Sequence, residues 1–201
     1  MKQNIPMIKL IQSTTVFFLK TLARLPFWLI YLISDFLYPI VFHIIGYRRK
    51  VVFTNLKNSF PEKSQKEIDQ IARRFYHHLC DLILESVKLY RMSEKDMDER
   101  LIVHGLEKTN AYAAQGKSMI LIGMHYNNWE WSSTLQRRSA HQALVVFNPL
   151  RNNPKMEQFL CHARERFGSK TVPINLSART TIQFSKKGRP TCLFLVADQT
   201  P

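Results

Sequence analysis

The sequence has few cysteines and few acidic residues. Only three cysteines occur in 201 residues, and they are widely separated, at Cys80, Cys161 and Cys192. Their odd number and spacing predict neither a disulfide framework nor a zinc site, so a reducing compartment is the simplest interpretation. Fifteen acidic residues stand against 29 basic ones, which gives a formal net charge of +14. This imbalance favours an acidic partner, such as nucleic acid, anionic lipid or an acidic carrier protein, without choosing among them.

Several catalytic and nucleotide-binding motifs are also absent. The sequence contains no G-x-S-x-G serine elbow, no P-loop and no G-x-G-x-x-G fingerprint, and its cysteines lack a local nucleophile signature. A covalent acyl-enzyme is therefore not indicated, and direct transfer between two bound substrates is. Hydrophobic residues make up 45% of the chain, which argues against global disorder and allows one sizeable core.

The N-terminal region is the most apolar part of the chain. Residues 26–47 form a run of about the length that a membrane-spanning helix needs, roughly 20 residues. The run contains Asp35, Pro39 and His43, so a spanning helix, a kinked hairpin and a helix lying in the membrane interface all remain open. A buried core helix of a soluble protein is the non-membrane alternative. The basic residues 48–50 follow directly and suit contact with anionic lipid, so we expect membrane association.

The remainder of the chain predicts helices that alternate with strands. Ser64 and Glu67 form a capping box that starts a helix over about residues 64–90. A polar stretch then turns the chain before a short strand at 101–103. Further strands are expected at 119–122, 143–147, 170–174 and 191–196, with helices at 108–115, 129–138, 155–167 and 177–187. This order predicts an α/β fold, a mostly parallel sheet flanked by helices. The chain ends just after a strand-exit loop, which predicts a domain incomplete at its C-terminus.

The segment GKSMILIGMHYNNWEW, residues 116–131, carries the candidate chemistry. It predicts a short strand that ends in a loop with His125, and Glu130 follows five residues later. A neutral imidazole is the commonest general base near pH 7, and a carboxylate that binds its other nitrogen fixes its tautomer. Asn128 and the start of the next helix could bind an oxyanion or phosphate. In a parallel sheet, residues 148–153 and Asp198 should reach the same edge. The alternative is a surface histidine and a helix-dipole glutamate.

The same residues resemble a known family. GMHYNNWE resembles the HFGNWE block of the bacterial lipid A biosynthesis acyltransferases, and VFNPLRNNPKMEQFL, RERFG and FLVADQTP match that family in order and spacing. The resemblance covers nearly the whole chain. Tyr126 and Asn127 replace the usual Phe-Gly, and Asn148 stands where an arginine is common, with Arg151 as a candidate substitute. The family continues well past this C-terminus, which agrees with the expectation of an incomplete domain.

The resemblance implies a fold like that of the glycerolipid acyltransferases and an O-acyltransferase activity. It implies transfer of a fatty acyl chain from an acyl carrier protein thioester to a hydroxyl of a lipid A precursor. The site would lie at the cell inner membrane and face the cytoplasm. Residues 1–50 would be the membrane anchor and residues 51–201 an incomplete α/β acyltransferase domain. No cofactor, metal or nucleic acid is expected.

The resemblance also implies roles for individual residues. His125 would be the general base on the acceptor hydroxyl, and Glu130 the carboxylate that orients it. Arg164, with Arg166 as second choice, would bind phosphate or an oxyanion. Asp198 would position substrate or arginine, and Asn128 and Arg151 are further substrate-binding candidates. A solvated helix charge is the alternative for Arg164, and a loop cap is the alternative for Asp198.

Two other functions remain open at the level of sequence. The first is acyl transfer to another phospholipid or glycolipid acceptor, because the acceptor, the acyl length and the choice between carrier protein and coenzyme A as donor are not encoded in these motifs. The second is a non-enzymatic, basic membrane-surface protein. The basic residues are dispersed and no stacking-aromatic motif accompanies them, so nucleic-acid binding is not favoured.

Overall fold

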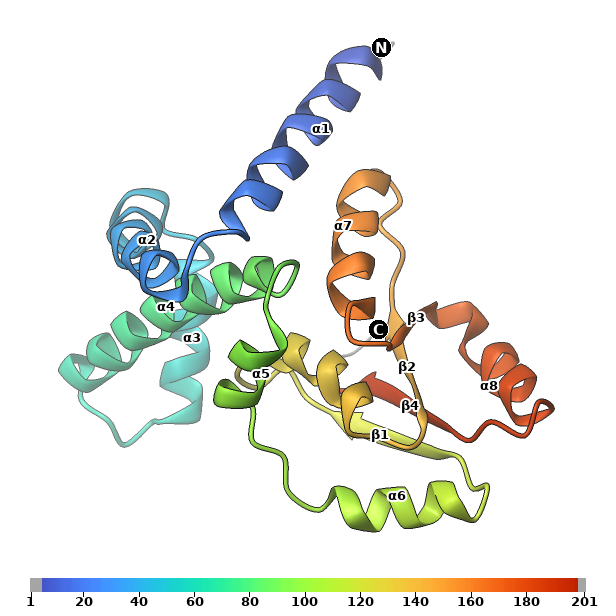
Figure 1. The fold of residues 1–201 in the computed structure, drawn as a ribbon. Helices are drawn as coiled ribbons and strands as arrows, with labels where there is room; N and C mark the ends of the chain where they lie inside the picture. The colour runs from blue at the N-terminus through green and yellow to red at the C-terminus, as the bar shows by residue number, and fades with distance from the viewer. Residues whose placement is uncertain (1–4, 199–201) are drawn as a thin grey trace. The chain divides into compact units, whose positions relative to one another are not determined.

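The computed structural model describes residues 5–198, which fall into two compact units (Figure 1). Leu25–Lys88 form one unit, and the segments on either side of it, residues 5–24 and 89–198, form the other. The expected division at residue 50 concerned membrane association rather than packing, so it stays a prediction. Residues 199–201, the end of the FLVADQTP motif, lie outside the described residues.

The Leu25–Lys88 unit is entirely helical. It contains α2 (Phe27–Pro39), the π-helix η1 (Ile40–Ile45), α3 (Arg49–Ser59) and α4 (Gln65–Lys88). The predicted capping box at the start of α4 is confirmed, since the Glu67 carboxylate accepts hydrogen bonds from the Ser64 amide at 2.9 Å and from the Ser64 hydroxyl at 2.8 Å. Tyr76, on the buried face of α4, donates its hydroxyl to the carbonyl of Tyr47 at 2.6 Å.

The apolar stretch of this unit forms a continuous helical segment over α2 and η1. Phe27–Ile45 has the length and composition of a membrane-spanning helix, with a mean hydropathy of 1.7. Large side chains along it are exposed, including Trp28 at 68% and Phe36 at 70%. The acidic group within it is partnered, because the Asp35 carboxylate lies 2.8 Å from Nε2 of His77 on α4. The segment is therefore a candidate membrane anchor, as the sequence predicts.

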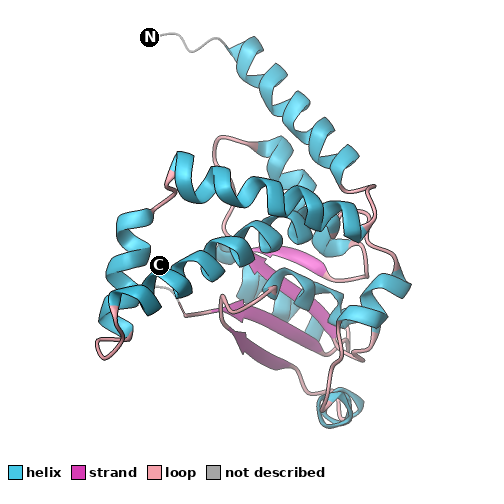
Figure 2. Cartoon of the chain, turned by 90° about the vertical axis from the view of Figure 1, so that its left-hand side faces the viewer, coloured by secondary structure: helices cyan, strands magenta, loops and turns pink. Residues whose placement is uncertain are grey.

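The other unit is built on a four-stranded parallel sheet, which confirms the predicted fold class (Figure 2). Its strands are β1 (Met119–Gly123), β2 (Gln142–Phe147), β3 (Lys170–Pro173) and β4 (Thr191–Val196), in the spatial order β1-β4-β2-β3. All three strand pairs are parallel. Their carboxyl ends therefore meet at one edge, where parallel sheets place ligands.

The two faces of the sheet are covered by different helices. On one face, Phe184 of α8 (Ser177–Ser185) packs on the buried Leu144, Val172 and Leu193. The next residues along the strands, Val145 and Phe194, lie on the opposite face, because side chains alternate along a strand. That face carries α7 (Pro154–Glu165) and the 3₁₀-helix η2 (Trp129–Arg137). The remaining helices of this unit are α1 (Ile5–Leu22), α5 (Glu94–Arg100), α6 (Leu106–Ala114) and the 3₁₀-turn η3 (Ile174–Leu176).

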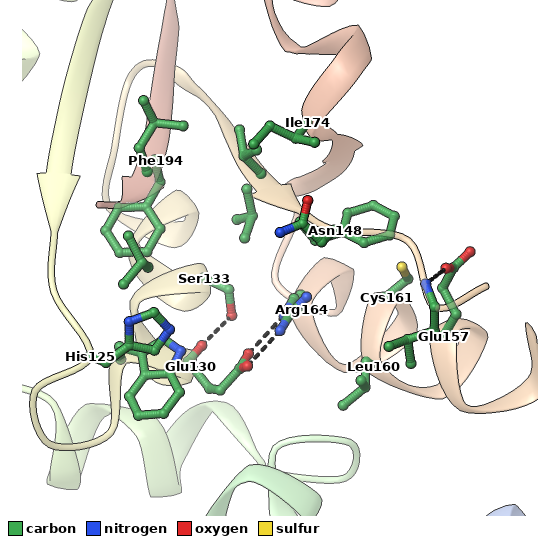
Figure 3. A pocket seen from close by; sticks show the side chains of 17 residues that line it. His125, Glu130, Ser133, Asn148, Glu157, Leu160, Cys161, Arg164, Ile174 and Phe194 are labelled. Atoms are coloured by element: carbon green, nitrogen blue, oxygen red, sulfur yellow. Dashed lines mark hydrogen bonds and ion pairs between the residues drawn. The ribbon is translucent and has the colours of Figure 1, made fainter. Parts of the chain in front are cut away.

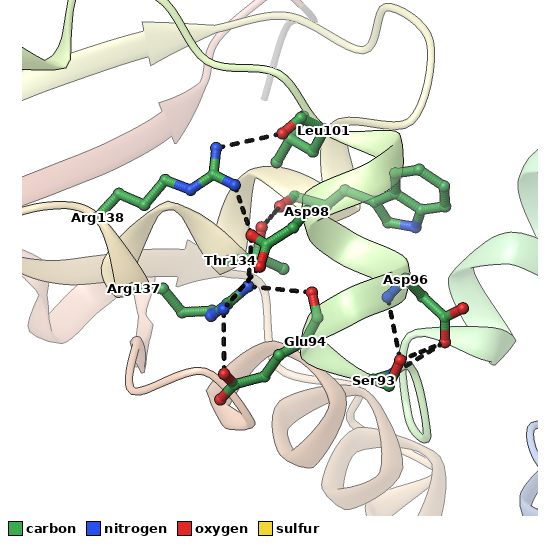
Figure 4. Close-up of polar contacts among 9 residues, drawn as sticks. Ser93, Glu94, Asp96, Asp98, Leu101, Thr134, Arg137 and Arg138 are labelled. Carbon is green, nitrogen blue, oxygen red and sulfur yellow. Dashed lines mark hydrogen bonds and ion pairs between the residues drawn. The ribbon is translucent and has the colours of Figure 1, made fainter.

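The polar stretch after α4 is helical rather than a turn, and residues 101–103 do not form the expected strand. The overlooked signal is a second capping box, in which Ser93 and the Asp96 carboxylate bind each other's backbone amides. Asp98 then ties α5 to η2, since its carboxylate accepts from Arg137 at 3.0 Å and from Arg138 at 2.5 Å (Figure 4). These hydrogen bonds lower the pKa of Asp98.

Candidate active site

His125 and Asp198 occupy equivalent positions after two neighbouring strands. β1 and β4 run parallel with Gly123 opposite Val196, and each of these two side chains lies two residues beyond that pair. The backbone bond from the Ala197 amide to the Gly123 carbonyl, 3.1 Å long, keeps the two exit segments together. Strand pairing therefore places an imidazole and a carboxylate side by side at the carboxyl edge of the sheet.

Asp198 binds both the backbone and the side chain of His125. One carboxylate oxygen lies 2.7 Å from Nδ1 of the imidazole, and the other accepts from the His125 amide at 2.9 Å. The sequence-based pairing of His125 with Glu130 is not the pairing in the structure. The reason is the strand order. Because β1 and β4 are adjacent, Asp198 lies beside the imidazole ring, whereas Glu130 lies in η2 and its carboxylate binds Arg164.

The Asp198 contact fixes how the imidazole can act. A carboxylate at Nδ1 favours the tautomer that carries its proton there, which leaves Nε2 as a hydrogen-bond acceptor. Among the described residues, no side chain forms a hydrogen bond with that Nε2 atom. The hydrogen bond from His125 lowers the pKa of Asp198, and burial opposes this only in part, so the carboxylate is ionised at neutral pH. Both side chains are about one-third exposed, at 32% and 35%, so a substrate could reach them.

Glu130 forms a mostly buried, two-point ion pair with Arg164 of α7. Nε of the guanidinium lies 2.7 Å from one carboxylate oxygen, and Nη2 lies 2.5 Å from the other. The arginine and glutamate side chains are only 17% and 15% exposed. Burial by itself lowers the pKa of Arg164, but the hydrogen bonds and negative charge of Glu130 outweigh burial and raise it. The fork geometry fixes the guanidinium in one orientation.

A cavity of about 310 Å³ is lined by His125 of the first pair and by both members of the second pair (Figure 3). His125, Glu130 and Arg164 line it together, and the figure shows the glutamate and arginine side chains pointing toward one another. Most of the remaining wall is apolar. Its apolar lining residues are Trp129, Val145, Val146, Phe147, Leu150, Leu160, Ile174, Phe194, Leu195 and Val196. The cavity thus places a candidate base and a fixed cation beside a surface suited to an aliphatic chain.

Neighbouring residues hold the His125 loop in place. The Trp129 ring packs edge-on against the imidazole, with 4.7 Å between ring centroids. Asn127 adopts a left-handed backbone conformation with φ of 51°, a region that glycine and asparagine tolerate best. This explains how asparagine can stand where the resembling family usually has glycine. Gly123 lets the Phe194 ring approach the strand end, since a Cβ there would lie 2.9 Å from that ring.

The other predicted site residues are distributed unevenly. Arg164, rather than the second choice Arg166, lines the cavity, because Arg166 donates to the Tyr90 carbonyl at 3.1 Å instead. Asn128 is half-buried at the start of η2 and makes no side-chain cap bond. Arg151 is exposed, and neither it nor Asn128 is among the residues that line the cavity. Their predicted substrate contacts remain predictions.

Sequence reasoning missed the apolar wall and several other residues that line the cavity. Ser133 and Cys161 both line the cavity. Burial raises the pKa of the Cys161 thiol, so it stays neutral, which agrees with the absence of a cysteine-nucleophile motif. The helical spacing of Glu157, Leu160 and Cys161 with Arg164 could have shown that one face of α7 carries all four. Within residues 5–198, no cluster of three or more His, Cys, Asp or Glu side chains could hold a metal ion.

Comparison with known proteins identifies a family for this chain. Residues 2–200 match the family model described as bacterial lipid A biosynthesis acyltransferase. The chain is also 26% identical, over 155 residues, to a "Lipid A biosynthesis acyltransferase" from Haemophilus influenzae (strain ATCC 51907 / DSM 11121 / KW20 / Rd). That alignment covers 77% of this chain and 48% of the relative, so the chain spans about half the length of the curated relative that it matches.

Proposed function

We propose, on the premise that this chain belongs to the bacterial lipid A biosynthesis acyltransferase family, that it transfers a fatty acyl group to a hydroxyl of a lipid A precursor. An acyl carrier protein thioester is the proposed donor. The observation that carries the proposal is the His125–Asp198 pair, whose imidazole lines a largely apolar cavity. The formal charge of +14 suits both an acidic carrier and an anionic glycolipid.

The proposed reaction is a direct transfer. Nε2 of His125 removes the proton from the acceptor hydroxyl as its oxygen attacks the thioester carbonyl carbon. The resulting tetrahedral intermediate collapses, the carbon–sulfur bond breaks, and the leaving thiolate takes the proton back from the imidazolium. The products are an ester and a free thiol. Asp198 holds the imidazole in the required tautomer and stabilises its charged form, so it takes the orienting role that sequence reasoning gave to Glu130.

Glu130 acts in this proposal as a positioning residue for Arg164. The guanidinium, held by two hydrogen bonds on one side, offers its remaining N–H groups to the carbonyl oxygen of the thioester or to a substrate phosphate. Fixed donors of this kind stabilise developing charge without reorganising during the reaction. The apolar lining provided by residues such as Phe147, Leu160 and Phe194 supports binding of the acyl chain in the same cavity.

The proposed location is the cytoplasmic face of the inner membrane, where carrier protein and lipid acceptor meet. The candidate span Phe27–Ile45 and the basic residues after it support membrane attachment. Acyl transfer from a purified acyl carrier protein to a lipid A precursor, followed by mass spectrometry, tests the function. Parallel reactions with glycerophosphate and phospholipid acceptors test the choice of acceptor. If only those acceptors are acylated, the proposed lipid A acceptor is wrong, although the protein is still an acyltransferase.

A further inference from the structure

A second cavity lies on the opposite side of α7 from the candidate active site. It has a volume of about 480 Å³ and is formed between α1, α7 and Tyr90, all within the same compact unit. Its lining residues on α1 are Ser13, Val16, Phe17 and Lys20, and those on α7 are Lys155, Gln158, Phe159 and His162. The four α7 residues follow helical spacing, so they share one face of that helix.

The polar lining of this cavity is cationic. Lys20 and Lys155 contribute two ammonium groups and His162 an imidazole, and none of the described residues that line the cavity is acidic. No carboxylate of residues 5–198 forms an ion pair with either lysine. Lys155 donates one hydrogen bond to the Ser13 hydroxyl, which leaves its other N–H groups available. Two lysines that line one cavity without a carboxylate partner favour an anionic ligand.

Lys20 and His162 lie beside an aromatic cluster. The Tyr90 ring stacks on Phe159 with centroids 4.6 Å apart and an interplanar angle of 3°. His162 lies 4.5 Å from the same tyrosine ring, and the Lys20 ammonium lies 5.5 Å from it. Tyr90 is only 9% exposed, so its ring is packed against protein rather than surrounded by solvent. Lys20 and His162 therefore lie against a buried tyrosine ring, and Lys155 lines the same cavity.

The α1 part of the wall also carries apolar side chains, Val16 and Phe17. Phe17 lines the cavity yet is 66% exposed, and its neighbour Phe18 is 64% exposed. Further exposed apolar side chains lie along α1, at Met7, Leu10 and Ile11. A free inorganic anion would use the cations and leave these side chains in water. A ligand with both a phosphate and an aliphatic part would use both surfaces.

We infer that the cavity between α1 and α7 binds the phosphate headgroup of an anionic lipid, with Lys20, Lys155 and His162 on the phosphate and Phe17 beside the acyl part. This site is separate from the reaction cavity, because α7 forms a wall of both and turns a different face to each. It gives the chain a lipid contact outside the candidate span and does not depend on the proposed acyl transfer.

Calorimetric titration of the full chain with soluble dihexanoyl phosphatidic acid, below its micellar concentration, tests the inference. Dihexanoyl phosphatidylcholine supplies the same chains without net charge, and inorganic phosphate supplies the anion without chains. We expect the phosphatidic acid to bind more tightly than either. Equal binding of inorganic phosphate would identify a site for a free phosphate and overturn the lipid assignment, and so would equal binding of phosphatidylcholine.

A matched pair of double variants locates the binding. The variant Lys20→Gln/Lys155→Gln should weaken binding about tenfold or more, because it removes two cations that attract the anionic headgroup. The control Lys186→Gln/Lys187→Gln removes the same charge beyond α8, away from the cavity, and should bind as the unchanged protein does. Equal weakening in both would contradict the site. Matching circular dichroism spectra and melting temperatures establish that both variants fold.

The outcome is distinguishable from failure of the proposed function. The variant His125→Ala should lose acyl transfer and still bind phosphatidic acid with unchanged affinity. If Lys20→Gln/Lys155→Gln impairs transfer from the carrier protein while lipid binding stays unchanged, the basic face serves the acidic carrier and the lipid site is wrong.

Discussion

The two faces of α7 differ in whether their cationic side chains have carboxylate partners. On the face that lines the reaction cavity, Arg164 is neutralised by Glu130, and nearby His125 is held by Asp198. On the other face, Lys155 has a hydroxyl partner, and no described residue that lines the cavity is acidic. Paired charges hold groups at fixed positions for chemistry, whereas cations without carboxylate partners are available to an incoming anion.

Removal of the proposed base should have the largest effect. His125→Ala should lower kcat by about 10²–10⁴-fold, because general base catalysis contributes roughly that factor. The control is His104→Ala, an exposed histidine outside both cavities, which should keep normal activity. Steady-state transfer from acyl carrier protein, with melting curves for each variant, gives the comparison. Normal turnover in His125→Ala would remove the imidazole from the mechanism.

The next comparison asks which carboxylate serves the imidazole. Asp198→Asn should lower kcat by about 10²-fold or more, because an amide favours the wrong tautomer and does not stabilise the imidazolium. It should also alter the pH profile of kcat, because the imidazole loses its carboxylate partner. Glu130→Gln should lower activity without that change in the profile, because Glu130 contacts Arg164. The reverse pattern, with the profile altered only by Glu130→Gln, would restore the sequence-based pairing.

Loss of the Glu130–Arg164 ion pair should lower the free energy of unfolding more than loss of Lys155 on the other face of α7. Glu130→Ala should lower the free energy of unfolding by about 3 kcal/mol, because Arg164 would be left mostly buried without its counter-charge. The double variant Glu130→Leu/Arg164→Met should recover most of that stability while staying inactive. Lys155→Ala on the other face should change stability by only about 0.5 kcal/mol. Urea denaturation of the four proteins measures this, and equal losses on both faces would contradict the contrast.

Salt should affect lipid binding on one face of α7 more than it affects the ion pair on the other, and this difference should be smaller than the effects above. Binding of phosphatidic acid in the α1–α7 cavity should weaken several-fold between 50 and 500 mM NaCl, because its charges are accessible to ions. The free energy lost in Glu130→Ala should change little over the same range, because that pair is mostly buried. Titration calorimetry and denaturation at both salt concentrations provide the two measurements. Lipid binding that is insensitive to salt would exclude the proposed cationic recognition.

The smallest expected effect is a pH dependence of stability from Asp198. Its pKa is lowered in the folded chain, so its contribution is present above the unfolded value of about 3.9 and is lost as the pH falls below it. The stability difference between the unchanged chain and Asp198→Asn should therefore shrink between about pH 5 and pH 3. Asp98 behaves in the same direction, so Asp98→Asn serves as the comparison. A difference that grows on acidification would contradict the assigned sign.

The agreement between sequence and structure is closest where local pattern decides. Helix α4 and strand β4 lie where capping and apolar spacing put them. Helix α5 was missed because it has few apolar residues, so it lacks the hydrophobic periodicity of a helix although its capping box is present. The helix expected at residues 129–138 is the 3₁₀-helix η2. Arg164 was chosen ahead of Arg166, and the structure likewise places it in the cavity.

The sequence by itself determined the alternation of helices and strands, and it placed His125 in a loop at a strand end, because both follow from residues near one another in the chain. Only the tertiary structure decided which acid serves that histidine. Asp198 is 73 residues away and reaches the ring because β4 pairs directly with β1. The same strand order and the packing of α7 on η2 bring Arg164 within hydrogen-bonding distance of Glu130, which is 34 residues away in the chain. Spacing along the chain carries no information about such pairings, since strand order is set by burial of whole faces.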